Sequence, residues 1–128
     1  MCSQRVLWKL PFPSTSFDGD AHFCADTIRF QYYRDGVLYR SGIRFARVPA
    51  TRTCAERCSK AWRIEVAYDT LVEIDNSTWV REIRADTQEM WRNTWQMHHF
   101  MIYLDSAGCF EVIAESWEVL PEEPGAWA

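Results

Sequence analysis

The sequence lacks the long apolar runs that mark membrane-spanning and secreted chains. Its 128 residues contain no stretch of about 18 consecutive apolar residues, the length at which an apolar helix becomes a candidate to cross a bilayer. Near the start, the apolar residues 6–8 are followed at once by Lys9 and then by Pro11, so this run is far shorter than the core of a secretory signal. We therefore expect a cytoplasmic protein with no membrane contact.

Motifs for phosphate and metal binding are also missing. The five glycines are scattered, and neither a Walker sequence nor a dinucleotide-binding fingerprint occurs. The five cysteines are odd in number and widely spread, which argues against a closed disulfide framework. Cys54, Cys58 and Trp62 recur every four residues, and we interpret them as a buried stripe on a short helix rather than as metal ligands. No metal and no cofactor are predicted.

Acidic residues are almost missing from one part of the chain, and basic residues are scarce in another. Residues 27–63 hold nine basic and two acidic residues, whereas residues 64–128 hold three basic and thirteen acidic residues. We favour internal pairing of these charges across a sheet, because opposite charges on neighbouring strands are a common way to satisfy a solvated face. A free basic face that meets an anionic partner and head-to-tail self-association are the alternatives. The net charge of -4 and the lack of a recognition motif argue against nucleic acid as a partner.

Two pairs of alternating apolar stretches each predict a β-hairpin. The first pair comprises residues 25–33 and 37–48, with Asp35 and Gly36 between them, which is a preferred combination for a two-residue type I′ turn. This turn predicts three cross-strand pairs: Arg34 with Val37, Tyr32 with Tyr39, and Ile28 with Ile43.

The second pair comprises residues 97–104 and 109–117. With a three-residue loop at 106–108, in which Gly108 takes the left-handed conformation, Asp105 faces Cys109 and the register follows. One face is then wholly apolar, and it pairs Leu104 with Phe110, Ile102 with Val112, and Phe100 with Ala114. The other face is mixed, and it pairs Tyr103 with Glu111, Met101 with Ile113, and His99 with Glu115.

The residues between these hairpins predict two helices and a strand. Thr53 and Glu56 form a capping-box signature, which predicts a short helix over residues 53–62. Residues 63–68 alternate in polarity and predict a strand that extends toward residue 74. Ser77 and the two polar residues before it offer an N-cap to a longer helix. The apolar positions of that helix are Trp79, Val80, Ile83, Met90, Trp91 and Trp95.

These elements predict an α+β fold in a single domain over residues 1–120. We expect an antiparallel or mixed sheet of about five to six strands, with one hairpin at each end of the chain, residues 4–10 as an edge strand, and the two helices covering one face. A strongly curled sheet or half-open barrel around the long helix is the alternative. Residues 121–128 are expected to form an extended C-terminal tail, in which Trp127 docks on its own domain, docks on a partner or is disordered.

Candidate functional residues lie on the mixed face of the second hairpin and on the basic strand. His99 beside Glu115 predicts a general base, because a carboxylate orients the imidazole and fixes its tautomer. Arg40 or Arg44 is expected to hold an acidic substrate. The predicted interface or pocket lining consists of Met101, Tyr103, Ile113 and Trp117.

The leading functional hypothesis is a small binding or protein-interaction module without catalysis, which self-associates as a homodimer through this aromatic and Met-rich surface. The alternative is a small α+β enzyme, a lyase, isomerase or hydrolase that acts on a small acidic organic molecule. A measurement of solution mass at micromolar protein concentration tests the homodimer, and a clean monomer would remove it.

Overall fold

The computed structural model of the protein describes residues 3–55, 60–88 and 96–128. Within these ranges the chain forms strands, two α-helices and one short 3-10 helix. None of the helices has the length and apolar character that a membrane crossing requires. The elements are β1 (Gln4–Lys9), η1 (Ser14–Ser16), β2 (His22–Cys24), β3 (Thr27–Arg34), β4 (Val37–Ala46), β5 (Ala50–Cys54), α1 (Ala61–Ala67), β6 (Thr70–Ile74), α2 (Thr78–Asp86), β7 (His98–Leu104), β8 (Gly108–Ala114), β9 (Ser116–Val119) and β10 (Glu123–Pro124).

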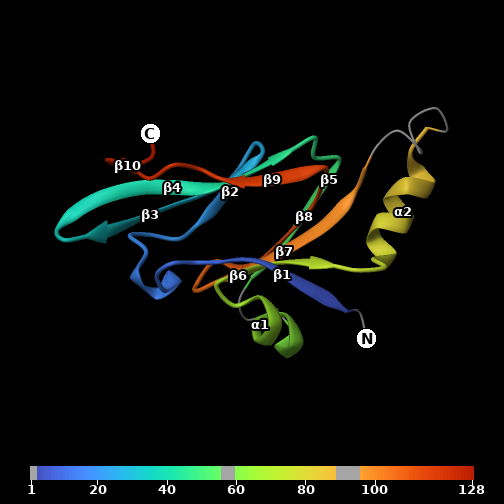
Figure 1. The fold of residues 1–128 in the computed structure, drawn as a ribbon, viewed down its shortest axis with the longest axis horizontal. Helices are drawn as coiled ribbons and strands as arrows, with labels where there is room; N and C mark the ends of the chain where they lie inside the picture. Colours follow the sequence, from blue (N-terminus) through green and yellow to red (C-terminus); the bar gives the residue numbers. More distant parts are fainter. Residues whose placement is uncertain (1–2, 56–59, 89–95) are drawn as a thin grey trace.

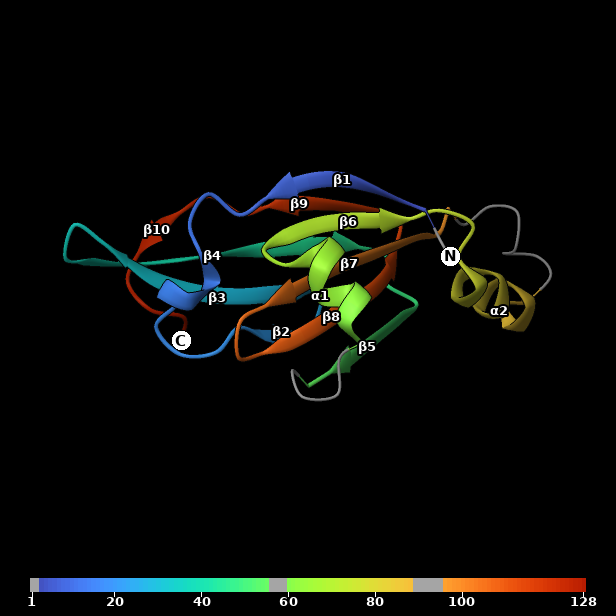
Figure 2. The same ribbon diagram turned by 90° about the horizontal axis from the view of Figure 1, so that it is seen from below.

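The ten strands form two antiparallel sheets that pack face to face (Figures 1 and 2). Sheet A has the order β1-β6-β7-β8-β5, and sheet B has the order β10-β4-β3-β2, with β9 also paired to β4. The predicted α+β class is confirmed, whereas the prediction of one sheet with five to six strands is wrong. The alternative of a half-open barrel around the long helix is also wrong, because α2 lies at one end of the molecule rather than inside a curled sheet (Figure 1).

The chain changes sheets at Glu115, which explains why one predicted strand becomes two. Residues 109–117 were expected to form a single strand, but β8 ends at Ala114 in sheet A and β9 begins at Ser116 in sheet B. At the crossing, the backbone N–H of Glu115 donates to the carbonyl of Ala46 on β4 at 2.9 Å. A strand that switches sheets at a bend is a usual way to make the corner of a sandwich.

The main core lies between the sheets, and a smaller one lies on the outer face of sheet A. The main core is formed by inward-facing side chains of both sheets: Ile28, Phe30, Tyr32, Ile43, Phe45, Leu71, Phe100, Ile102, Leu104, Phe110, Val112 and Ala114. Helix α1 covers part of the outer face of sheet A (Figure 1) and contacts β6 and β7. The buried residues of this second core are Ala67, Val72, Ile74, Met101, Tyr103 and Cys109. Both faces of β7 and β8 are therefore buried.

The register of β3 and β4 agrees with the turn at Asp35 and Gly36. Both turn residues have positive φ, 52° and 78° respectively, as a type I′ turn requires. The predicted pairs are confirmed: Arg34 lies opposite Val37, Tyr32 opposite Tyr39, and Ile28 opposite Ile43.

The predicted register of β7 and β8 is wrong by two residues. Leu104 lies opposite Gly108 rather than Phe110, and His99 lies opposite Ile113 rather than Glu115. The loop comprises residues 105–107, with Ser106 in the left-handed region at φ 65°. Because the slip is an even number of residues, every side chain keeps its predicted face and only its partner changes.

The glycine at position 108 explains this slip. A Cβ on Gly108 would lie 2.2 Å from the carbonyl oxygen of Cys54 on β5. A glycine is therefore required here by the close approach of a neighbouring strand, in addition to the positive φ of 102° that it adopts. The sequence contains no earlier sign of β5, so the glycine was assigned to the loop.

The helix predicted over residues 53–62 is wrong at its start, although its last two residues are helical, and the strand predicted over residues 63–68 is wrong. Residues up to Cys54 form β5, because their alternating side chains pair with β8. Cys54 therefore lies opposite Cys109 on the neighbouring strand β8, and Trp62 is exposed on α1. The predicted buried stripe does not form with these two residues, and its third member, Cys58, lies outside the described residues. Residues 61–67 form α1 instead of a strand, since Ile64 and Ala67 are also spaced to share one face of a helix.

The predicted N-cap of the second helix is confirmed. The Ser77 hydroxyl accepts a hydrogen bond from the backbone N–H of Val80 at 3.2 Å, and α2 begins at Thr78. Helix α2 ends at Asp86, and the positions predicted to extend its apolar face, Met90, Trp91 and Trp95, lie outside the described residues.

The uneven charge distribution is resolved by internal pairing, which confirms the favoured interpretation. Six of the nine basic residues in 27–63 form ion pairs with carboxylates of the second half. The pairs are Arg34–Glu122, Arg40–Glu123, Arg44–Glu118, Arg47–Glu115, Arg52–Glu111 and Arg63–Glu111.

The C-terminal residues pack against sheet B instead of extending from it. Strand β10 pairs with β4, and the Trp127 indole N–H lies 3.0 Å from the carbonyl oxygens of both Phe30 and Ser41. The Arg29 guanidinium lies 4.6 Å from the centroid of the Trp127 ring, a cation–π contact. Trp127 is thus docked on its own domain.

Two glycine substitutions test the close approach of β5 to β8. Gly36→Ala places a side chain at a positive φ in open space, so we expect a loss of about 1–2 kcal/mol in the free energy of unfolding. Gly108→Ala adds a backbone clash at β5, so we expect it to lose about 2 kcal/mol more than Gly36→Ala. Urea unfolding of both variants measures the difference, and equal losses would contradict the contact at Cys54.

Candidate functional site

A chain of hydrogen bonds, buried except at its Arg52 end, connects three strands with the start of helix α2 on the outer face of sheet A. The Ser77 hydroxyl lies 2.7 Å from Nδ1 of His99, and Nε2 of the same ring lies 2.8 Å from Oε1 of Glu111. Glu111 also accepts two hydrogen bonds from one edge of the Arg52 guanidinium, from Nε at 2.8 Å and from Nη2 at 3.0 Å. Ser77, His99 and Glu111 are 6%, 5% and 3% exposed. These four residues are called the Ser77–Arg52 chain below.

Strand pairing positions each member of this chain. His99 on β7 and Glu111 on β8 both point to the outer face of sheet A, and Arg52 on β5 lies directly opposite Glu111. Strand β6 ends at Ile74, which lies opposite His99. The chain then turns through Asn76, at φ 52°, and brings Ser77 to the ring of His99 as the N-cap of α2.

Two guanidinium groups hold Glu111 in its ionised form. Burial alone would raise the pKa of this carboxyl group, but hydrogen bonds from His99 and Arg52 and the charges of Arg52 and Arg63 outweigh burial and lower the pKa to about 2. The carboxylate at neutral pH therefore accepts hydrogen bonds and donates none.

The ionised carboxylate sets the direction of the remaining hydrogen bonds. Because Glu111 accepts, we assign a proton to Nε2 of His99, which leaves the lone pair of Nδ1 to accept from the Ser77 hydroxyl. The Ser77 oxygen meanwhile accepts the Val80 N–H. Each polar group in this sequence of donors and acceptors has a partner, as buried polar groups require.

Trp79 in the first turn of α2 covers the chain. Its ring meets the His99 ring edge to face, with the centroids 5.1 Å apart. The Arg52 guanidinium lies 4.1 Å from the centroid of the Trp79 ring. This contact covers one face of the Arg52 guanidinium, while the Arg52 side chain as a whole remains 44% exposed.

A cleft of about 350 Å³ opens beside Ser77 and His99. It lies where β6 and β7 meet the start of α2, and its volume falls within the usual range of small-molecule sites. The lining residues are Glu73, Ile74, Asp75, Asn76, Ser77, Val80, Arg81, Met97, His98 and His99. The Ser77–Arg52 chain thus ends at the wall of a cavity that a ligand can enter.

The two carboxylates of this cleft share one neighbouring cation. The Arg5 guanidinium lies 3.0 Å from Glu73 and 3.3 Å from Asp75, and His98 lies 2.8 Å from Glu73. Arg81 donates to the Asn76 carbonyl at 3.1 Å and has no acidic partner within the described ranges. Arg81 is therefore the one guanidinium lining the cleft that has no carboxylate partner among the described residues, and the formal charges of Arg5, Arg81, Glu73 and Asp75 sum to zero. The part of the chain that the structure describes contains no group of three His, Cys, Asp or Glu residues able to hold a metal ion.

The predicted pairing of His99 with Glu115 is wrong. His99 binds Glu111 because the β7–β8 register differs by two residues from the predicted one. Glu115 lies at the crossing between sheets, where it pairs with Arg47 at 3.2 Å. His99 itself does reach a cavity, as the enzyme hypothesis requires, although with different partners.

The residues of the predicted interface do not form one surface, because some are buried in sheet A and the others lie on sheet B. Met101, Tyr103 and Ile113 are fully buried in sheet A, where α1 covers two of them, so they offer no contact surface. Trp117 on β9 is half-buried and packs against the main core. Arg40 and Arg44 lie on sheet B, away from His99, and pair with Glu123 and Glu118.

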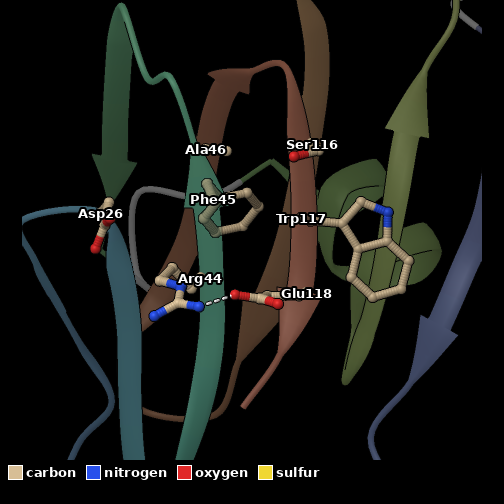
Figure 3. Close-up of a pocket in the computed structure, with 7 residues that line it drawn as sticks. All are labelled: Asp26, Arg44, Phe45, Ala46, Ser116, Trp117 and Glu118. Carbon is tan, nitrogen blue, oxygen red and sulfur yellow. Dashed lines mark hydrogen bonds and ion pairs between the residues drawn. The ribbon is translucent and has the colours of Figure 1, made fainter.

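Arg44 and Trp117 nevertheless share a second, smaller pocket of about 250 Å³ (Figure 3). Figure 3 shows Arg44 joined to Glu118 between β4 and β9, with Asp26 on its other side. Because acidic side chains flank the guanidinium on both sides, this pocket offers little attraction for an anionic substrate. The cleft at α2 is the stronger candidate site.

Sequence reasoning missed the roles of Ser77, Glu111 and Arg52. Glu111 was placed on the same face as His99, and Ser77 was recognised only as a helix cap. One local signal could have predicted the contact between Ser77 and His99: a serine that caps a helix directly after a strand, followed by a histidine on the next strand. The role of Arg52 could not be found, because the residues around it were predicted to lie just before a helix rather than in a strand.

No protein-family model, curated protein or solved structure matches the chain, so its function has to be argued from the geometry of the site.

The pH dependence of stability tests the ionised state of Glu111. A pKa lowered from 4.5 to about 2 contributes about 3 kcal/mol to folding above pH 4.5, and this contribution is lost as the pH falls toward 2. The advantage of the wild type over Glu111→Gln in urea unfolding should therefore shrink by about 3 kcal/mol between pH 6 and pH 2. An advantage that does not change with pH would contradict the assignment.

The exposed pair of Arg44 and Glu118 provides the matched control. Glu118→Gln removes a carboxylate that also pairs with an arginine, but at the surface. We expect this variant to change the free energy of unfolding by less than about 1 kcal/mol.

Proposed function

We propose that the chain is a small-molecule-binding module whose ligand occupies the cleft at the start of α2. The observation that carries the proposal is the buried Ser77–Arg52 chain, which ends at the wall of this cleft through Ser77 and His99. A buried ion pair is often no more stabilising than well-packed apolar residues would be. Its presence beside a cavity therefore favours a role in recognition.

The chemistry of the cleft favours a small organic acid or a derivative of one. Ile74, Val80 and Met97 provide apolar wall, while Ser77 and His99 provide hydrogen-bonding groups. Arg5 is engaged by Glu73 and Asp75, so the Arg81 guanidinium, which has no acidic partner within the described residues, is the cation available to an incoming carboxylate. The volume of about 350 Å³ suits a molecule of modest size.

This proposal retains the binding role expected from the sequence but not the reason for self-association. The homodimer was expected because of a surface formed by Met101, Tyr103, Ile113 and Trp117. The first three residues are buried, and Trp117 is half-buried against the main core. A ligand in the α2 cleft requires no second copy of the chain. Solution mass remains the test of the homodimer.

Thermal unfolding in the presence of small carboxylic acids tests the proposal. A panel of acetate, butyrate, benzoate and succinate should include a ligand that raises the midpoint, and a ligand at ten times its Kd adds about 1.4 kcal/mol. For a domain of this size the shift is about 5 °C. Val80→Trp should abolish the shift, because the larger side chain fills the cleft.

Glu82→Trp is the matched control, since it adds the same side chain to an exposed position on α2 outside the cleft. It should leave the shift unchanged. Absence of a shift across the panel, or an equal shift in Val80→Trp, would overturn binding at this site.

A further inference from the structure

We propose that Ser77 is a nucleophile and that the cleft hydrolyses small carboxylic esters. This inference rests on the proposed function, because the ester has to occupy the same cleft as the ligand. It assigns Ser77 and His99 as catalytic residues and Glu111 and Arg52 as positioning residues.

The first support is the order of donors and acceptors. In the tautomer assigned above, the Ser77 hydroxyl donates to Nδ1 of His99, 2.7 Å away, and the opposite ring nitrogen donates to the Glu111 carboxylate at 2.8 Å. A hydroxyl, an imidazole and a carboxylate in this order constitute the arrangement that activates a serine nucleophile. Here the serine faces Nδ1 and the carboxylate faces Nε2, which reverses the more usual orientation of the ring. Both ring nitrogens can accept and donate a proton, so the reversal preserves the chemistry.

The second support is that capping alone does not require this arrangement. An N-cap needs only a side-chain oxygen that accepts a backbone N–H, and Asn, Asp or Thr would serve as well as Ser. The additional hydrogen bond from Ser77 to His99 is not part of a cap. His99 is in turn fixed by Glu111 and by the edge-to-face contact with Trp79, so its lone pair is held toward Ser77.

The third support is access. Ser77 and His99 both line the cleft, while Glu111 and Arg52 are absent from its lining and lie behind them. A substrate can therefore reach the nucleophile and the base without meeting the ion pair. The neighbouring thiol of Cys109 does not compete as a nucleophile, because burial and the charge of Glu111 raise its pKa to about 12.

The reaction follows from these positions. Ser77 Oγ attacks the ester carbonyl carbon, and its proton moves to Nδ1 of His99. The bond from this carbon to the alcohol oxygen breaks, and the leaving alcohol takes the proton from His99. Water then attacks the acyl-Ser77 carbonyl carbon and gives a proton to His99, which returns it to Ser77 Oγ as the carboxylic acid leaves. One ester and one water yield one alcohol and one acid.

Labelling with an alkyl fluorophosphonate tests the nucleophile. Ser77 Oγ should displace fluoride from phosphorus, and the intact mass should rise by one alkylphosphonyl group, located on Ser77 by peptide mass spectrometry. This measurement uses the unaltered protein, so it does not depend on the folding of any variant. Labelling on another residue, or no labelling, would overturn the proposal.

Variants then separate catalysis from structure. Ser77→Asn keeps a side chain able to cap α2 but has no hydroxyl, so it should not be labelled and should not hydrolyse p-nitrophenyl acetate. His99→Gln should reduce the rate of labelling about 100-fold or more, because it removes the base. Ser16→Ala, which alters an exposed serine in η1, should be labelled like the wild type.

The failure of this proposal is distinguishable from that of the binding proposal. If the wild type binds a small carboxylic acid in the thermal assay but resists the fluorophosphonate, Ser77 is not a nucleophile and the module only binds. If neither occurs, the cleft is not a ligand site and both proposals fall. Labelling at Ser77 that depends on His99 is the result that supports both.

Discussion

The ion pair between the partly exposed Arg52 and the buried Glu111 is the interaction on which the rest of the site depends. It joins β5 to β8, and through His99 and Ser77 it extends to β7 and the N-cap of α2. Glu111 is buried, so the loss of the Arg52 charge would leave its carboxylate less well compensated. The edge strand, the central strands and the helix are thus coupled by one carboxylate, whose ionised form sets the direction of each hydrogen bond.

The outer face of sheet A serves two purposes because two different helices cover it. Beneath α1 it is apolar and adds a second core, with Met101 and Tyr103 in its interior. Beneath the start of α2 it is polar and ends at a cleft. Alternate side chains of β7 and β8 point to this outer face and contribute to both regions. His99 and Glu111 are therefore held by strands that are buried on both faces. Such support limits the movement of His99 and Glu111, which a preorganised site requires.

The parts of the fold that could be predicted from sequence depended on local chemistry. The turn at Asp35 and Gly36 allowed the register of β3 and β4 to be predicted, and Ser77 marked the start of α2. The α+β class and the internal pairing of charge also followed from sequence patterns. What could not be predicted depended on contacts distant in sequence. Gly108 is required by β5, and the strand after β8 changes sheets at Glu115, so the partner of His99 and the second sheet were both missed. The site was predicted to contain His99, but its acid, its serine and its arginine come from three separate elements.

The central claim is that Nε2 of His99 carries a proton toward Glu111 while Nδ1 accepts from Ser77. Long-range proton–nitrogen NMR correlation of the histidine rings at neutral pH measures this directly, because protonated and bare ring nitrogens resonate far apart. The account predicts a protonated Nε2 and a bare Nδ1 for His99, with the Nδ1 resonance displaced in Ser77→Asn. A proton on Nδ1 would contradict it, since Ser77 would then accept from His99 and could not be activated by it.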